Sequence, residues 1–143
     1  MKKKQKQIVL ISCVKKKLNK KTKAEYLYTS DLFKSNLRYA KSLKPDTIYI
    51  LSAKYGLLKL SDIIEPYDKT LNKMKKAERV EWAKEIITSL KEDNNIENDN
   101  FIFLAGKKYR EFLLEDIVNS EIPMEGLPLG KQLQWLKEKL KNG

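Results

Sequence analysis

Histidine is absent from this chain of 143 residues, and cysteine occurs once, at Cys13. The first absence excludes an imidazole base and any metal site with histidine ligands. A single cysteine excludes an internal disulfide and a cysteine cluster for zinc. We therefore expect no metal.

Long apolar runs are also missing. None approaches the roughly 18 residues that a membrane span needs, and the lysine-rich start lacks the apolar segment of a signal peptide. We expect a soluble cytoplasmic protein with no membrane partner. The length indicates one domain over residues 1–143, with residues 1–6 as a flexible basic lead-in. The sequence does not indicate an oligomeric state.

Positive charge is concentrated at the beginning of the chain. The formal net charge is +11, and residues 1–23 contain ten lysines and no acidic residue. The other 120 residues carry 20 basic and 19 acidic groups, a balance of +1. Such a cluster can neutralise phosphates and predicts a nucleotide or nucleic-acid partner with salt-dependent binding. The alternative is a solubilising tail in a lysine-rich protein.

Three short apolar runs predict a buried sheet, at residues 8–11, 47–52 and 101–105. Helical patterns follow each of them, at residues 30–43, 75–91 and 107–118, and a last helix ends near Asn142. Residues 14–30 and 58–71 are interpreted as loops, and residues 120–123 as an optional fourth strand. This alternation predicts an α/β fold, three-layered and Rossmann-like or flavodoxin-like. Its open parallel sheet would have three to four strands, with helices on both faces.

Polar residues follow the first strand, where open α/β sheets place their ligands. In an extended segment Cys13, Lys15 and Lys17 point to one side and Lys16 to the other. Neighbouring lysines favour the thiolate form of Cys13, and crowding by cations makes Lys17 a better amine nucleophile. We predict Cys13 or Lys17 as nucleophile, with Ser12 and Lys15 binding substrate. The alternatives are a small apolar thiol that closes a strand and lysines that are merely solvated.

The second strand ends in a similar polar turn, which contains Ser52, Lys54, Tyr55 and Gly56. If the two strands are neighbours, these residues lie near Cys13, and we predict that they bind substrate. Lys54 would hold negative charge, and Gly56 would allow a sharp turn or a close approach to a ligand. Tyr55 would stack on a base or simply cover the edge of the sheet.

Further candidates lie in the later loops. Asp68 is predicted as a general acid or base, or as a partner of a ribose hydroxyl, although it equally suits a turn that bonds its own backbone. Gly106 would present helix N–H groups to a phosphate. Gly126, Leu127 and Gly130 belong to a rigid loop that we expect to roof the crevice. This loop matches neither GxGxxG nor the P-loop pattern, so we expect no cofactor.

Five ordered motifs resemble small bacterial and phage proteins with a YaaA-like domain of unknown function. They are Ser12-Cys13-x-Lys15-x-Lys17, Tyr28-x-Ser30-x-Leu32-Phe33, Leu51-Ser52-Ala53-Lys54-Tyr55-Gly56-Leu57, Pro66-Tyr67-Asp68 and Gly126-Leu127-x-x-Gly130. The resemblance spans nearly the whole chain. It implies a Rossmann-like pocket for nucleobase or nucleic-acid chemistry, since YaaA relatives are linked to DNA protection under oxidative stress.

The first motif is more distantly similar to the catalytic core of archaeosine synthase. In that family a cysteine is followed, after three residues, by Lys-Pro-Tyr, and the lysine attacks a nitrile on a deazaguanine base in tRNA. Cys13 and Lys17 match this spacing. Leu18 and Asn19 replace the Pro-Tyr, so the reaction itself does not carry over.

The sequence therefore predicts a nucleotide-, nucleobase- or nucleic-acid-modifying enzyme, of transferase or glycosidase type, with its pocket at the carboxyl ends of the strands. The alternative is a noncatalytic nucleic-acid or nucleotide-binding module driven by the basic N-terminal segment. A phage protein that acts on a host factor is a third alternative.

Overall fold

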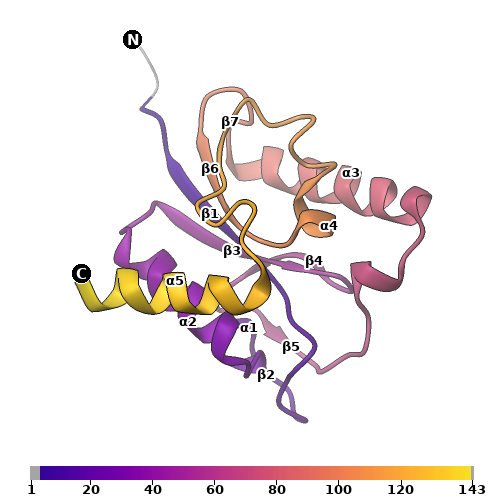
Figure 1. Cartoon of the computed structure of the whole chain (residues 1–143). Helices are drawn as coiled ribbons and strands as arrows, with labels where there is room; N and C mark the ends of the chain where they lie inside the picture. The colour runs from indigo at the N-terminus through magenta and orange to yellow at the C-terminus, as the bar shows by residue number, and fades with distance from the viewer. Residues whose placement is uncertain (1–3, 143) are drawn as a thin grey trace.

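The computed structural model describes the backbone of residues 4–142 and contains two sheets. The main sheet has five strands in the spatial order β4-β3-β1-β6-β7 (Figure 1). Their bounds, in that order, are Gly56–Lys59, Thr47–Ser52, Gln7–Ser12, Asn100–Leu104 and Asn119–Glu121. β3, β1, β6 and β7 run parallel, and β4 is antiparallel to β3. This mostly parallel sheet, together with the helices described below, confirms the predicted α/β class.

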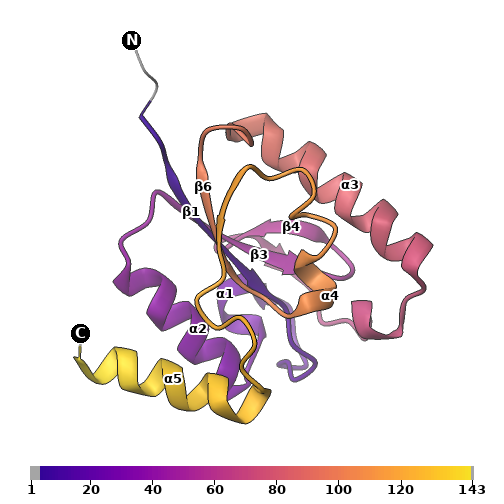
Figure 2. The ribbon, with the colours of Figure 1, turned by 45° about the horizontal axis from the view of Figure 1, so that its top comes forward.

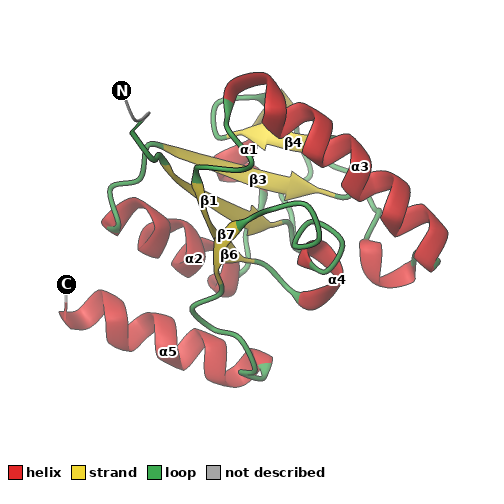
Figure 3. Ribbon diagram, turned by 90° about the horizontal axis from the view of Figure 1, so that it is seen from above, coloured by secondary structure: helices red, strands yellow, loops and turns green. Residues whose placement is uncertain are grey.

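Three long helices cover the main sheet. α2 (Asp31–Ser42) and α5 (Leu129–Asn142) lie together on one side, and α3 (Lys76–Asp93) lies on the other (Figures 2 and 3). Tyr39 of α2 packs edge-on against Trp135 of α5, with ring centroids 5.2 Å apart. Among the described residues, no helix has the length and apolar character needed to cross a membrane.

The central position of β1 explains its uninterrupted apolar run. It pairs with β3 on one edge and with β6 on the other, while helices cover both sides. All four residues from Ile8 to Ile11 consequently have no exposed surface. A strand that is buried on both faces needs apolar residues at consecutive positions rather than at alternate ones.

The predicted strands are present, and several helix boundaries agree with the sequence pattern. The hydroxyl of Ser30 accepts a hydrogen bond from the N–H of Phe33 (3.1 Å) and so caps α2. β7 (Asn119–Glu121) corresponds to the optional fourth strand predicted at residues 120–123. It begins one residue before the predicted start and ends two residues before the predicted end. The main sheet thus has four parallel strands, and β4 adds an antiparallel edge.

Two predicted loops contain regular structure. The first holds β2 (Thr22–Lys23) and α1 (Ala24–Leu27). The second, residues 58–71, holds the end of β4, all of β5 (Ile63–Ile64) and the first residue of the 3₁₀ helix η1 (Leu71–Lys73). β2 and β5 pair antiparallel as a second, two-stranded sheet. Their two-residue lengths are too short for a hydrophobic period, so only the pairing across the fold reveals them.

The helix predicted over residues 107–118 is much shorter. α4 comprises only Lys107–Arg110, and single turns follow it. Leu113 N donates to the carbonyl of Arg110 at 3.0 Å, an i→i+3 bond that tightens the chain. Tyr109, Leu113 and Ile117 are still buried, as their spacing required, although no continuous helix carries them.

Strand β1 also separates the N-terminal lysines into two groups. Lys4 and Lys6 precede the strand, whereas the lysines at positions 15–23 follow it and lie at the opposite edge of the sheet. Residues 1–3 lie outside the described residues. Gln5 and Lys6 are attached to the turn before β6, because Gln5 Nε2 donates to the Asn98 carbonyl (2.9 Å) and Lys6 N to the Asp99 carboxylate (3.0 Å).

Candidate functional site

The ends of β1 and β3 lie side by side. Ser12 is in register with Leu51, and the N–H of Cys13 donates to the Leu51 carbonyl at 2.9 Å. This pairing brings Cys13 and Ser52 to the same edge of the sheet. Two of the predicted polar strand ends therefore meet at the carboxyl edge, which is the usual position of ligand sites in α/β sheets.

A chain of buried hydroxyl groups starts at Ser52, which has no exposed surface. Its hydroxyl donates to the Tyr67 oxygen (2.9 Å) and accepts the N–H of Tyr55 (3.0 Å). The Tyr67 and Tyr28 hydroxyls are 2.7 Å apart and share a further hydrogen bond. Burial is the main cause that raises the pKa of Tyr67 well above its usual range, and the nearby Cys13 adds to this shift. Tyr67 therefore remains a neutral hydroxyl.

Cys13 lies next to this chain and contacts a third tyrosine. Its side chain is buried, and Sγ is 3.4 Å from the hydroxyl of Tyr109. That hydroxyl also accepts the N–H of Leu71 (3.3 Å) and is 3.4 Å from the Thr70 hydroxyl. Burial is the main cause that raises the pKa of Tyr109, and the charge of Cys13 adds to it. The Cys13 thiol thus lies among polar partners. One of them, Tyr109, comes from α4, which follows β6.

Lys17 places a positive charge over the same cluster. Its Nζ is 4.4 Å from the ring centroid of Tyr67 and 5.8 Å from that of Tyr28. It donates to the carbonyl of Lys15 at 3.1 Å. No ion pair within residues 4–142 includes Lys17.

The partial burial of Lys17 has an electrostatic consequence. Burial lowers the pKa of its ammonium, and the negative charges of Cys13 and Asp68 only partly oppose this shift. The neutral amine is therefore more accessible than in an ordinary lysine. Asp68 itself is exposed and lies in the loop between β5 and η1, next to Tyr67.

The other residues predicted at these two strand ends form the surroundings of the cluster. Ser12 is half-buried, whereas Lys15 and Lys54 are exposed. The Tyr55 ring packs edge-on against Tyr67 at 5.5 Å, and its hydroxyl donates to the Glu65 carbonyl (3.2 Å). Gly56 begins β4 with a φ of +76°, a left-handed conformation that glycine adopts easily.

A groove of about 470 Å³ adjoins the cluster. Its lining residues come from the β3–β4 turn, the following loop and α3, and they are Ala53, Lys54, Tyr55, Gly56, Lys69, Met74, Ala77, Glu78, Glu81, Trp82 and Glu85. Trp82 connects the groove to the cluster: its indole N–H donates to the Ser52 carbonyl (2.9 Å), and its ring meets that of Tyr109 edge-on at 5.7 Å.

The glycines predicted in the later loops are placed differently. Gly106 precedes only the four-residue α4, so the long helix that was expected to present its N–H groups to a phosphate at this glycine is absent. Gly126 has a φ of +83° in an exposed turn after β7, and Gly130 lies in the first turn of α5. The Leu127 carbonyl accepts a hydrogen bond from the Gln132 side chain at 2.8 Å, which attaches this loop to α5. No hydrogen bond among the described residues joins the loop to Cys13 or Lys17.

Sequence reasoning gave no functional role to the aromatic residues that complete the cluster, Tyr28, Tyr67, Tyr109 and Trp82. A signal for two of them was present. Tyr28 and Tyr67 stand in polar loop motifs rather than in apolar runs, and the chain has seven tyrosines against four phenylalanines. Tyrosine in such places indicates a hydroxyl that has a partner.

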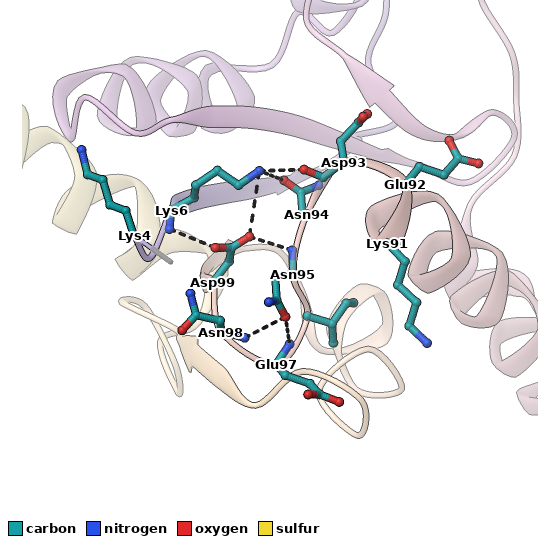
Figure 4. Close-up of a pocket in the computed structure, with 11 residues that line it drawn as sticks. Lys4, Lys6, Lys91, Glu92, Asp93, Asn94, Asn95, Glu97, Asn98 and Asp99 are labelled. Atoms are coloured by element: carbon teal, nitrogen blue, oxygen red, sulfur yellow. Dashed lines mark hydrogen bonds and ion pairs between the residues drawn. The ribbon is translucent and has the colours of Figure 1, made fainter. Parts of the chain in front are cut away.

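A second cavity lies elsewhere, before β1 and β6 (Figure 4). It has about 640 Å³ and is lined by residues 91–99 together with Lys4 and Lys6. Its central charges are already paired, since Lys6 Nζ donates to the Asp93 carbonyl (2.7 Å) and lies 4.0 Å from the Asp99 carboxylate. Asp99 also accepts the N–H of Asn95 at 2.8 Å. These bonds hold the turn closed, so we assign this cavity a structural role.

Residues 4–142 contain no group of three histidine, cysteine, aspartate or glutamate side chains placed to hold a metal ion. No curated protein and no solved structure matches the chain. A family model matches residues 8–138, which include every strand of both sheets apart from Gln7 at the start of β1, together with Tyr28, Tyr67 and Tyr109. The chain therefore belongs to DUF6884, a family of unknown function.

Proposed function

We propose that this protein is an enzyme that modifies a nucleobase, a nucleotide or a nucleic acid at the carboxyl ends of β1 and β3. The observation that carries the proposal is the position of Lys17. Its amine is partly buried, has no ion pair among the described residues, and lies over the Tyr67 ring beside a thiol and a chain of hydroxyls. An amine of lowered pKa in such a setting is a typical nucleophile.

The surrounding groups supply the remaining roles. Lys17 attacks an electrophilic carbon of the substrate, and the Cys13 thiol is the second candidate nucleophile. Asp68 exchanges protons with water or with the leaving group. Of the neutral Tyr28 and Tyr67 hydroxyls, the one that does not donate in their shared bond is a hydrogen-bond donor for charge that develops in the transition state. Transfer of a base and cleavage of a glycosidic bond both suit this set.

The groove beside the cluster has a size that suits a nucleotide. Its volume of about 470 Å³ falls in the usual range for small-molecule sites. Tyr55 offers a flat ring for a base, and Lys54 and Lys69 offer positive charge for a phosphate beside the carboxylates of Glu78, Glu81 and Glu85. Lys15, which is exposed two residues before Lys17, would hold a further phosphate.

The order of the strands and the resemblance to known families also support the proposal. The parallel strands follow the order β3-β1-β6-β7, with α2 and α5 on one side and α3 on the other. We infer from this a three-layer, flavodoxin-like fold, in which ligands bind where the strand order reverses, between β1 and β6, and Tyr109, which follows β6, contacts Cys13 from that side. The resemblance of the Cys13 and Lys17 motif to the core of archaeosine synthase, and of the whole chain to YaaA-like domains, favours nucleobase chemistry.

Ligand-observed NMR tests the proposal directly. The probes are the four common free bases and the 5′-monophosphates of their nucleosides, added to wild-type protein and to Lys17→Met, Cys13→Ala and Lys16→Met. Lys16 is exposed and adjacent in sequence, so its variant is the matched control. We expect at least one probe to bind wild type and Lys16→Met, and to bind at least one of the other two variants about tenfold more weakly. Unchanged binding in both Lys17→Met and Cys13→Ala would overturn the proposed site.

A further inference from the structure

The lysines that follow β1 are displayed on a fixed framework. Lys20, Lys21 and Lys23 are exposed, and none belongs to an ion pair within residues 4–142. Their segment is hydrogen-bonded on both sides: Leu18 N donates to the Leu27 carbonyl (2.8 Å), and Ala24 N donates to the Asp62 carbonyl (2.7 Å). β2 then pairs with β5. A solvated tail would lack these bonds, whereas a binding surface gains from such preorganisation.

Two large apolar side chains are exposed in the same region. Tyr26 is 58% exposed and Ile63 is 63% exposed. Ile63 is in register with Lys23, and Tyr26 belongs to α1, which directly follows β2. Figure 1 shows β2, β5 and α1 together beyond the carboxyl end of β1. We call these five residues, Lys20, Lys21, Lys23, Tyr26 and Ile63, the lysine strip.

The nearby acidic side chains weaken this positive field only in part. Glu25 forms an ion pair with Lys41 at 3.7 Å, and the Asp62 carboxylate accepts the N–H of Lys59 at 2.8 Å. Glu65 and Asp68 are exposed and remain as negative charges of this edge. Lys15 and Lys16 are exposed at the same edge, so positive charge predominates there.

We propose that the lysine strip binds a single-stranded nucleic acid, with its lysines on the phosphates and Tyr26 under a base. Positive charge combined with an exposed aromatic ring is the usual composition of single-strand binding surfaces. The inference rests on the proposed function and deepens it: the substrate is a strand, and not a free nucleotide.

The lysine strip begins only three positions after Lys17, which belongs to the cluster around Cys13. Lys17 forms an antiparallel bridge with Tyr28, so the loop that carries Lys20, Lys21 and Lys23 closes directly on the cluster. A strand held on the loop therefore has one nucleotide beside Lys17. A single strand also suits the chemistry, because a base must leave its stack before an enzyme can reach its ring atoms.

Fluorescence anisotropy with a labelled poly-dT oligonucleotide, and with a hairpin duplex of the same charge, tests the lysine strip. The test variant is the triple change Lys20→Gln, Lys21→Gln and Lys23→Gln, with Tyr26→Ala as a second variant. The control is Lys91→Gln, Lys137→Gln and Lys141→Gln, which removes the same charge from exposed positions on α3 and α5.

We expect the triple lysine-strip variant to bind the single strand at least about tenfold more weakly, with a salt slope lower by about 2. Tyr26→Ala should weaken it roughly fivefold or more. Equal losses in the control variant, or a duplex that binds as tightly as the single strand, would overturn the inference. Lys17→Met separates the two proposals. Normal strand binding in that variant, together with unchanged base binding in both Lys17→Met and Cys13→Ala, means that the catalytic site is wrong and the strip is right.

Discussion

The ammonium of Lys17 lies 4.4 Å from the ring centroid of Tyr67, and Tyr67 in turn shares a hydrogen bond with Tyr28. A cation over an aromatic face is attracted by the ring, but this attraction replaces only part of the hydration that burial removes. The contact therefore holds the amine in place without an opposing carboxylate close enough to form an ion pair.

The first prediction concerns the reactivity of this amine. Burial lowers the pKa of Lys17, so its neutral, nucleophilic form appears at lower pH than in an ordinary lysine. Labelling with limiting acetic anhydride between about pH 7 and pH 11, followed by peptide mass spectrometry, gives a midpoint for each lysine. The midpoint of Lys17 should lie below that of exposed Lys16. A midpoint equal to or above that of Lys16 would contradict this account.

The second prediction concerns the hydroxyl chain. Tyr67→Phe removes the oxygen that accepts the Ser52 hydroxyl and pairs with Tyr28, leaving buried groups without partners. We expect the free energy of unfolding to fall by about 1–3 kcal/mol. A double-mutant cycle with Tyr28→Phe should show a coupling of about 0.5 kcal/mol or more in urea denaturation. Tyr26→Phe, in which the altered hydroxyl belongs to an exposed ring, is the control and should leave stability unchanged. Strictly additive effects of Tyr28→Phe and Tyr67→Phe would argue against the shared bond.

The third prediction compares two glycines. Gly56 has a φ of +76°, whereas Gly106 has an ordinary φ of −64° and open space where the methyl group of an alanine would lie. Gly56→Ala should lower the free energy of unfolding by about 1–2 kcal/mol, because an L-residue is strained in the left-handed region. Gly106→Ala should change it by less than about 0.5 kcal/mol. Thermal denaturation of the two variants measures the difference, and equal losses would refute the conformational explanation.

The fourth prediction tests the structural role of the cavity before β1 and β6. Asp99 is 2% exposed and accepts the N–H groups of Lys6 and Asn95. Asp99→Ala leaves both donors unpaired and should cost about 1–3 kcal/mol in urea denaturation. Asp93→Ala is the matched control, since only the carbonyl of this exposed residue contacts Lys6. Loss of nucleotide binding with full stability in Asp99→Ala would instead identify a ligand site.

This cavity also affects how the basic N-terminal segment is tested. Deletion of residues 1–6 would remove Gln5 and Lys6, which are hydrogen-bonded to Asn98 and Asp99. A loss of nucleic-acid binding after that deletion would thus mix a change of charge with a loss of stability. Substitution of the lysine strip avoids this problem, because the side chains of its lysines form no ion pair within residues 4–142.

Local sequence patterns determined the central part of the fold. Four consecutive apolar residues identified β1 as a strand buried on both faces, and the side chain of Ser30 marked the start of α2. The polar residues after β1 and β3 also indicated the edge at which Cys13 and Ser52 meet. These features depend on neighbours within a few residues, so a pattern of types and spacing is sufficient to find them.

Tertiary structure alone decided the composition of the cluster and the shape of its surroundings. Tyr28, Tyr67 and Tyr109 come from three separate segments, and their hydroxyls meet partners 39 and 96 residues away in the chain. The pairing of β2 with β5 likewise joins two segments that the sequence presented as loops. Such contacts follow from how the connections cross the sheet, and no local period encodes that crossing. The sequence therefore indicated the edge of the sheet at which Cys13 and Ser52 meet, and the fold selected the tyrosines that surround Cys13 and Lys17.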